Sequence, residues 1–345
     1  MNSVERVTRT INFKETDRVP RGLNGTSDKN HRRLAAELGA SSVREMYKTL
    51  GIDIWHVNIG SPLRYAGKKR FHKNMEADYW GIPLAVYKDG DSSGLCPLAE
   101  IETTEEAWAY EFPSINDFAI ASLENDLAEY GDFAIEGGLW APIFHVLTWL
   151  CGFETSLSNL LLRPEASKVL IGRITDFWID CAKMILDAAN GRIQMMKNCN
   201  DFGTQRGLVF SREIFLEFFK PELKRLYEAI KGYGVYVMQH SCGGVSEIIG
   251  DFVEIGADVI NPVQVSASGM EIEGLAKKYA GKICFYGGID TQRLLPKGSP
   301  ELIACETRRT LGFFKDAGGY ILCPSQGVEE DISAKSLACM IGAAE

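Results

Sequence analysis

The chain has 345 residues, of which 46% are hydrophobic and 24% are charged, values typical of a soluble globular protein. It carries 37 basic and 46 acidic residues, and the resulting net charge of −9 argues against binding to nucleic acid or to an anionic membrane surface. No stretch approaches the roughly 20 apolar residues of a membrane span, and the first residues lack the apolar core of a signal peptide. We therefore expect a cytoplasmic protein whose nine scattered cysteines stay reduced.

Short apolar runs alternate with longer amphipathic segments along the chain. Two strands are predicted near the N-terminus, at residues 19–23 and 52–57. Six further apolar runs predict strands that begin near Phe133, Ile193, Val235, Asp258, Ile283 and Tyr320. Between them, hydrophobic residues at helical spacing predict helices such as Pro164–Ala189 and, with Ser211 as the N-cap, Glu213–Tyr227. Eight strand–helix units in series predict a (β/α)₈ barrel. A doubly wound sheet is the competing fold, but no GxGxxG motif follows a first strand.

One region interrupts this alternation. Between residues 79 and 112 the pattern is strand-like, with turn residues at positions 88–91, and it predicts a β-hairpin inserted before the third strand. The sequence therefore predicts an α/β protein with one domain over residues 1–345, a (β/α)₈ TIM barrel with a hairpin insertion near residues 79–112.

The strongest candidate site follows the predicted strand at Val235. In such a barrel the functional residues lie at the carboxyl ends of the strands. His240 and Cys242 are two residues apart at such an end, so their side chains project to the same side. Imidazole and thiolate suit Zn²⁺, which in catalytic sites keeps three protein ligands and one open position. Cys323, after the last strand, is a candidate third ligand. The alternative is a core histidine beside a buried cysteine.

Two other loops carry acids and amides that could act on a substrate. Asn200, Asp201 and Gln205 follow the strand at Ile193, and we consider Asp201 a candidate to share a proton with substrate while the two amides bind it. Asp290 follows Gly287-Gly288 and is a second catalytic candidate. The alternative for both loops is a structural one, in which the side chains cap the next helix or brace the loop.

Four aromatic residues follow the third strand, namely Trp140, Phe144, Trp149 and Phe153. Their near-helical spacing is typical of core packing. Any of them that lined the mouth of the barrel would favour a flat apolar ligand, and we take Trp140 as the substrate-binding candidate.

Long motifs in the C-terminal half carry a family resemblance. HSCGGVSEIIGDFVEIGADVINPVQ from His240 and FYGGIDTQRLLPKGSPE from Phe285 resemble the uroporphyrinogen decarboxylase superfamily. ERVTRTINFKETDRVPRG near the N-terminus and NDFGTQRG at Asn200 resemble it as well. The resemblance spans nearly the whole chain and implies a single barrel domain.

The resemblance also bears on which branch of the superfamily this is. Its decarboxylases resemble one another in an N-terminal Arg-Gln-Ala-Gly-Arg segment that holds the carboxylates of the porphyrinogen, whereas residues 20–25 here read PRGLNG. Because this segment is absent, decarboxylation of a polycarboxylate tetrapyrrole is the less favoured activity, and we keep it as the alternative. The methyltransferase branch has H-x-C as two zinc ligands, matched by His240 and Cys242, and the position of its third ligand falls on Gln326. Cys323, Glu136 or Glu329 could replace that ligand, or the site holds no metal.

Membership of the methyltransferase branch implies methyl transfer between a corrinoid (cobalamin) protein and a small substrate, with zinc as the metal. The partner would carry the methylcobalamin, and Gln326 would contact the substrate. The thiol-methylating members have a cysteine at the position of Gln326, and its absence here favours demethylation of an aromatic methyl ether, as in an O-demethylase component, over methylation of a thiol. A homodimer is compatible with this assignment, and a barrel that only binds a ligand is a third class of function.

Overall fold

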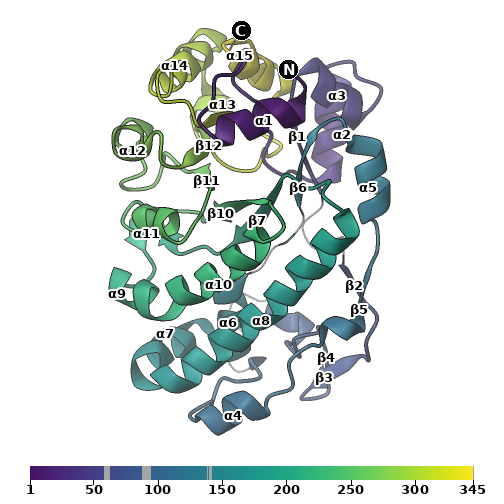
Figure 1. The fold of residues 1–345 in the computed structure, drawn as a ribbon, viewed down its shortest axis with the longest axis vertical. Helices are drawn as coiled ribbons and strands as arrows, with labels where there is room; N and C mark the ends of the chain where they lie inside the picture. The colour runs from purple at the N-terminus through teal and green to yellow at the C-terminus, as the bar shows by residue number, and fades with distance from the viewer. Residues whose placement is uncertain (58–62, 88–94, 138, 140–141, 345) are drawn as a thin grey trace.

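The computed structural model describes residues 1–57, 63–87, 95–137, 139 and 142–344. Its main feature is a curled sheet of seven parallel strands (Figure 1). In spatial order the strands are β1 (Ile54–His56), β6 (Ala134–Gly137), β7 (Met195–Cys199), β10 (Tyr236–His240), β11 (Val259–Val263), β12 (Cys284–Ile289) and β13 (Tyr320–Pro324). Each was predicted within a few residues of its observed start. Spatial order follows chain order, as strand–helix repetition requires.

The backbone of residues 20–22 lies between the two edge strands of this sheet. Gly22 N donates to Leu322 O in β13 at 2.9 Å, and Leu322 N donates to Pro20 O at 2.9 Å. On the other side, Asp53 N, just before β1, donates to Arg21 O at 2.8 Å. This is the segment in which the sequence predicts a first strand. The curled sheet with this segment between its edges is consistent with a TIM-like barrel.

The strands are buried because both faces of the sheet are covered. Every residue of β6, β7, β11, β12 and β13 is buried, which explains why these segments are apolar runs instead of alternating patterns. Alternate side chains fill the interior of the curl. This inner cluster comprises Val7, Ile11, Ile54, Ala134, Met195, Met238, Val259, Cys284, Tyr286, Ile321 and Cys323. Two of these belong to α1 (Ser3–Ile11), which therefore covers the amino ends of the strands.

Helices surround the outer face of the sheet. They are α2 (Asp28–Glu37), α3 (Val43–Thr49), α5 (Leu123–Tyr130), α8 (Pro164–Ala189), α10 (Lys220–Lys231), α11 (Ile249–Glu254), α12 (Ile272–Tyr279), α14 (Pro300–Gly312) and α15 (Ala334–Gly342). The predicted bounds of α8 are confirmed, with Pro164 in its first turn and Asn190 in the left-handed conformation at its C-cap. Ser211 caps the next helix as predicted. That helix is interrupted by a π turn, Phe215–Phe219, before Pro221, which has no N–H to continue the ladder.

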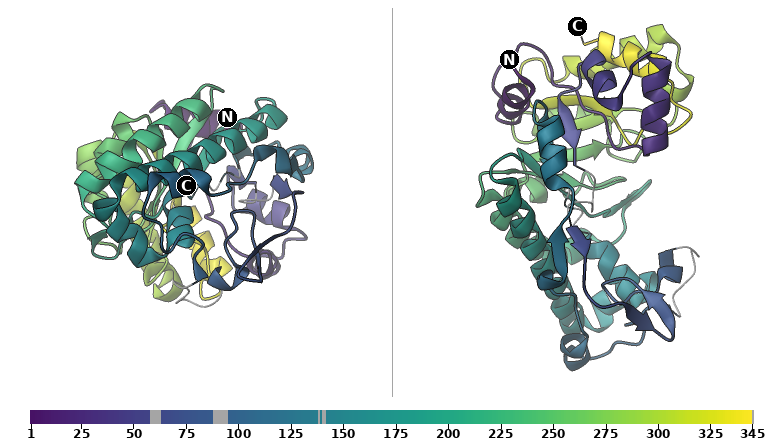
Figure 2. Two further views of the ribbon diagram at one scale, coloured as in Figure 1. Left: turned by 90° about the horizontal axis from the view of Figure 1, so that it is seen from below. Right: turned by 90° about the vertical axis from the view of Figure 1, so that its right-hand side faces the viewer.

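The predicted hairpin near residues 79–112 is not confirmed. The described residues of that range form the 3₁₀ turn η1 (Leu84–Tyr87) and the helix α4 (Thr104–Ala109), while the predicted turn at 88–91 lies outside the described residues. An antiparallel hairpin does occur, but earlier, between β3 (Arg70–His72) and β4 (Met75–Ala77). A second pair, β2 (Leu63–Tyr65) with β5 (Phe118–Ile120), brackets this excursion. Figures 1 and 2 show it at the end of the molecule remote from both chain termini.

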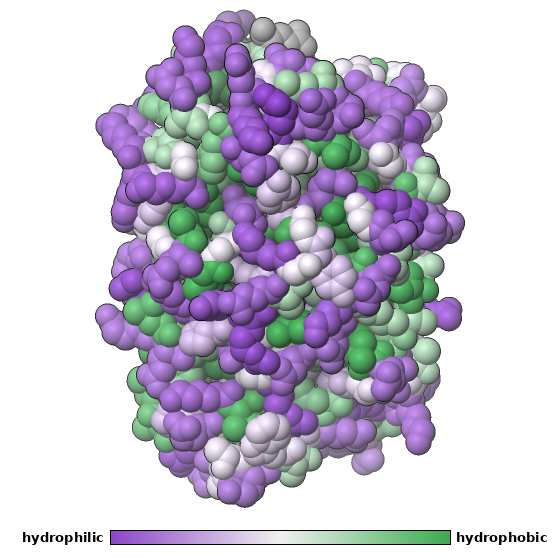
Figure 3. Space-filling view, in the orientation of Figure 1, coloured by the Kyte–Doolittle hydropathy of each residue, from purple (hydrophilic) through white to green (hydrophobic). Residues whose placement is uncertain are grey.

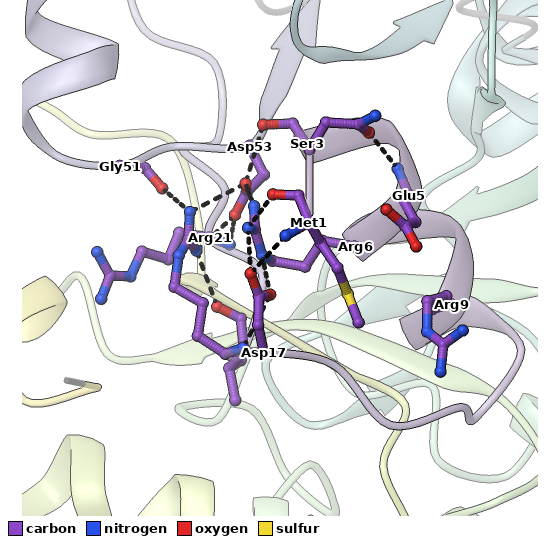
Figure 4. Close-up of polar contacts among 12 residues, drawn as sticks. Met1, Ser3, Glu5, Arg6, Arg9, Asp17, Arg21, Gly51 and Asp53 are labelled. Atoms are coloured by element: carbon purple, nitrogen blue, oxygen red, sulfur yellow. Dashed lines mark hydrogen bonds and ion pairs between the residues drawn. The ribbon is translucent and has the colours of Figure 1, made fainter.

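A network of charges around the buried Asp53 joins α1 to the amino ends of the strands (Figure 4). The side chain of Asp53 is fully buried, with its carboxylate 2.5 Å from Arg6 Nη1 and 2.7 Å from Arg18 Nη1. Arg6 Nε also contacts Asp17 Oδ1 at 2.7 Å. Because an isolated buried charge is costly, these ion pairs fix the position of α1 against the barrel.

The outer surface is mainly polar. On the face that Figure 3 shows, hydrophilic side chains predominate and hydrophobic ones form small separate patches. In the described parts of the chain, none of the helices combines the length and the hydropathy needed to cross a bilayer.

Candidate metal and substrate site

Three side chains able to ligate a metal lie together at the carboxyl ends of β7 and β10. Cys242 Sγ lies 3.4 Å from His240 Nε2, and Asp201 Oδ1 lies 3.8 Å from the same nitrogen. One ligand atom from each of the three residues lies within 4.8 Å of the other two. The structure therefore brings together the predicted pair, His240 and Cys242, and adds Asp201, which was predicted as a catalytic acid and not as a ligand.

Asp201 reaches this position because two loops cross with their backbones in contact. Asp201 Oδ1 accepts a hydrogen bond from Cys242 N at 2.9 Å, and Gly244 N donates to Thr204 O at 2.8 Å. At the crossing, a Cβ on Gly243 would lie 2.4 Å from the carbonyl carbon of Gly203, and Gly243 has a φ of +81°. Only glycine allows that approach and that backbone conformation.

His240 is held in the state that binds a metal. Its Nδ1 lies 2.7 Å from Asn261 Oδ1, and Asn261 Nδ2 donates to Asn24 Oδ1 at 3.1 Å. The amide oxygen is therefore an acceptor, so Nδ1 carries the proton and the lone pair of Nε2 faces Cys242. Burial and, secondarily, the charge of Lys197 lower the pKa of His240 to about 4, so the ring is neutral at pH 7.

The other two members have opposite pKa shifts. Burial and then the charge of Asp201 raise the pKa of Cys242 to about 12. Burial alone would raise the pKa of Asp201, but its contacts with His145 and with the backbone N–H of Cys242 outweigh this and hold the pKa well below its usual range. His145 Nε2, from α6 (Ile143–Cys151), lies 3.6 Å from Asp201 Oδ2. The carboxylate is charged at neutral pH, whereas the thiol needs a nearby cation to ionise.

The third ligand position is where prediction and structure differ. Cys323 is fully buried in the inner cluster and is not a member of the group formed by Asp201, His240 and Cys242. It is the fourth of the five residues of β13, and its side chain belongs to the interior of the curled sheet. Gln326, three residues further on, does reach the site. Its Nε2 donates to Cys242 Sγ at 3.1 Å and to Gln264 Oε1 at 3.3 Å.

The remaining predicted residues have structural contacts or lie away from this group. Asn200 is fully buried; its side chain accepts from Phe144 N at 3.0 Å and donates to Asn198 Oδ1 at 2.9 Å, which braces the loop. Asp290 accepts hydrogen bonds from the backbone N–H groups of the next turn, residues 292–294. Gln205 is exposed. Trp140 lies outside the described residues.

A hollow of about 810 Å³ opens beside the group. Gln326 lines it and also contacts Cys242, whereas Asp201, His240 and Cys242 are not among its lining residues. Three acids, Glu329, Glu330 and Asp331, are among its lining residues. We call the hollow together with the carboxyl ends of β7 and β10 the mouth.

The sequence predicted Glu136 only as a possible metal ligand, and it missed the charged group that Glu136 forms inside the barrel. His56 Nδ1 lies 2.7 Å from Glu136 Oε2, and Lys197 Nζ lies 3.6 Å from Glu136 Oε1. Glu136 and Lys197 are only 1% and 6% exposed. A lysine in the apolar run Met195–Cys199 was the available signal, because a charged side chain in a strand buried on both faces needs a specific reason.

Comparison with known proteins agrees with this architecture. The family model for uroporphyrinogen decarboxylase matches residues 116–345. A solved structure of a methyltransferase from Methanosarcina mazei superposes with a TM-score of 0.70 at 13% identity, over 100% of this chain and 98% of that one, which shows a shared fold. An L-ribulose 3-epimerase structure is more distant, with a TM-score of 0.38 at 11% identity, over 69% of this chain and 84% of that one. No curated protein sequence matches the chain.

Proposed function

This chain belongs to the uroporphyrinogen decarboxylase family, and we propose that it is a methyltransferase that moves a methyl group between a corrinoid protein and a small substrate. The observation that carries the proposal is the group formed by Asp201, His240 and Cys242 at the mouth. The same-fold methyltransferase from Methanosarcina mazei supports it by analogy of architecture.

The three side chains suit Zn²⁺ as the metal. They offer one nitrogen, one sulfur and one oxygen atom, the donor types that zinc accepts, and all three lie within 4.8 Å of one another. Asn261 orients the imidazole as outer-shell partners of zinc ligands do. A thiol whose pKa is raised to about 12 next to a carboxylate is a group that a cation would stabilise as thiolate. Three protein ligands would leave one position for substrate.

In this proposal the residues of the chain have distinct tasks. Asp201, His240 and Cys242 hold the zinc, which when bound supplies a Lewis acid for the substrate heteroatom. His145 positions Asp201 through its contact at 3.6 Å. Gln326 contacts both Cys242 and the hollow, so it is placed to orient the substrate. The substrate is proposed to be an aromatic methyl ether that donates its methyl group to the corrinoid, and the alternative is a thiol that accepts a methyl group from it.

Decarboxylation of a polycarboxylate tetrapyrrole fits the mouth less well. Three acids line the hollow and would repel a polycarboxylate. Arg21, the arginine of the PRGLNG segment, lies instead with its guanidinium near the carbonyl of Leu50, at 3.4 Å. The mouth therefore offers no arginine clamp from that segment.

The experiment is a zinc titration of the purified chain and of matched variants. The parent should bind one equivalent of zinc, and His240→Ala and Cys242→Ala should each lose it. Cys323→Ser should keep it, because Cys323 is outside the group, and Cys305→Ser, a change at an exposed free cysteine, serves as the control. Methyl transfer should then require both zinc and a corrinoid protein. A parent chain that binds no zinc, or a His240→Ala variant that binds it equally well, would refute the proposal.

A further inference from the structure

Lys197 is a buried cation on the inner face of the barrel. Met195, two residues before it, and Met238, its register partner on β10, both belong to the inner cluster, so the side chain of Lys197 points into the same interior. It lies two residues below His240 along the strand direction, a rise of about 7 Å. Its side chain is 7% exposed.

The positive charge of Lys197 is only partly matched. Within the described parts of the chain its ammonium group forms no hydrogen bond, and its one ion pair, with Glu136 Oε1, is 3.6 Å long. Glu136 is closer to His56, at 2.7 Å. Burial lowers the pKa of Lys197, but the charge of Glu136 outweighs this and raises it, so the amine is protonated at neutral pH. A buried ammonium with three donors and one distant carboxylate has capacity for another acceptor.

We propose that Lys197 is the anchor for an anionic oxygen of the small substrate, either a carboxylate or a phenolate. This inference rests on the proposed function for the identity of the site, since it places the anchored molecule between Lys197 and the metal ligands. An aromatic ring with an anionic group at one end and the reacting heteroatom at the other is a substrate of this kind, since the backbone of Lys197 lies about 7 Å below that of His240 along the strand direction. Glu136 then tunes the anchor by competing with the substrate for the same ammonium.

Because Glu136 and the substrate compete for Lys197, substitutions of these two residues should change the affinity for anions in opposite directions. Removal of the cation in Lys197→Met should weaken anion binding about tenfold or more, because a charge-assisted hydrogen bond is lost. Glu136→Gln keeps the shape but removes the competing carboxylate, so it should strengthen anion binding. A purely structural ion pair would give weaker binding or no change in both variants.

The probes are benzoate and 4-nitrophenolate, titrated calorimetrically into the full chain treated with chelator, so that no metal can act as the receptor. Lys197→Arg should restore part of the affinity. Lys220→Met is the matched control, because Lys220 pairs with Asp251 and Glu254 on the outer helices, and it should leave the affinity unchanged. Circular dichroism and thermal unfolding verify that each variant is folded.

The outcomes separate this inference from the proposed function. Binding of benzoate alone identifies a carboxylate as the anchored group, and binding of 4-nitrophenolate alone identifies a phenolate. Equal affinity of the parent and Lys197→Met for both probes, or a weakened Glu136→Gln, overturns the anchor even where zinc binding is intact. Anion binding that depends on Lys197 in a chain that binds no zinc supports the anchor and refutes the metal-dependent function.

Discussion

Gly243→Ala tests how the crossing loops build the site. The Cβ of an alanine would lie 2.4 Å from the carbonyl carbon of Gly203, 2.6 Å from its oxygen and 2.7 Å from Thr204 N. All three are backbone atoms, so no side chain can rotate away to make room. The backbone of residue 243 also has a φ of +81°, a conformation that residues with a Cβ rarely adopt.

Both penalties can be given a magnitude. A left-handed conformation costs a non-glycine residue about 1–2 kcal/mol, and overpacking against fixed neighbours costs about 1–3 kcal/mol. Gly243→Ala should therefore lower the free energy of unfolding of the zinc-free protein by about 2–5 kcal/mol. It should also weaken zinc binding, because separation of the loops draws Asp201 away from Cys242.

Urea denaturation of the chelator-treated protein measures the first effect, and competition with a chromophoric chelator measures the second. Gly274→Ala is the control, because Gly274 lies in the first turn of α12 and a Cβ there has no atom within 4 Å; it should stabilise the protein by up to about 1 kcal/mol. A change below about 0.5 kcal/mol for Gly243→Ala, with parental zinc affinity, would show that the backbone contact does not determine the site.

Three further predictions follow from other contacts. Asn261→Ala should weaken zinc binding about 10- to 100-fold in chelator competition, because it removes the acceptor that orients His240; unchanged affinity would exclude that role. Burial raises the pKa of Asp251, but its hydrogen bonds with Arg212 and Lys220 outweigh burial and lower the pKa. The contribution of Asp251 to the free energy of unfolding should therefore be complete above the unfolded-state pKa of about 3.9 and should be lost at lower pH. Asp251→Asn should accordingly lower the urea midpoint at pH 7 and have little effect near pH 2, and an effect independent of pH would contradict this. Asp53→Asn should cost about 3–5 kcal/mol in urea denaturation, since it removes the buried carboxylate that pairs with both Arg6 and Arg18 and leaves Arg6 with Asp17 alone; a cost below about 1 kcal/mol would show that water replaces the ion pairs.

Much of the fold could be predicted because its signals are local. A strand that is buried on both faces is an apolar run, and a surface helix repeats its apolar residues at helical spacing. The bounds of α8 and the capping role of Ser211 follow from residues adjacent in the chain. The hairpin was predicted at residues 79–112 and not at its actual position, because short antiparallel strands such as β3 and β4 have no such periodic signal.

The site was predictable only in part. His240 and Cys242 are separated by one residue on a strand end, so spacing alone predicts that they meet. Asp201 joins them from a loop about 40 residues earlier through the backbone contact of Gly203 with Gly243. The same limit applies to His145 and to the pairing of Glu136 with Lys197, whose partners lie on other elements.

The amino-acid sequence by itself determined the order of strands and helices, the parallel arrangement of the sheet and the meeting of one imidazole with one sulfur atom, because these depend on neighbours a few residues apart. Only the tertiary structure decided that Asp201 joins the group, that Cys323 lies in the inner cluster, and that the buried ammonium of Lys197 points into the interior of the curled sheet beside Glu136. Those facts depend on the stagger of adjacent strands and on which loops cross, and both are set by long-range packing that no local pattern encodes.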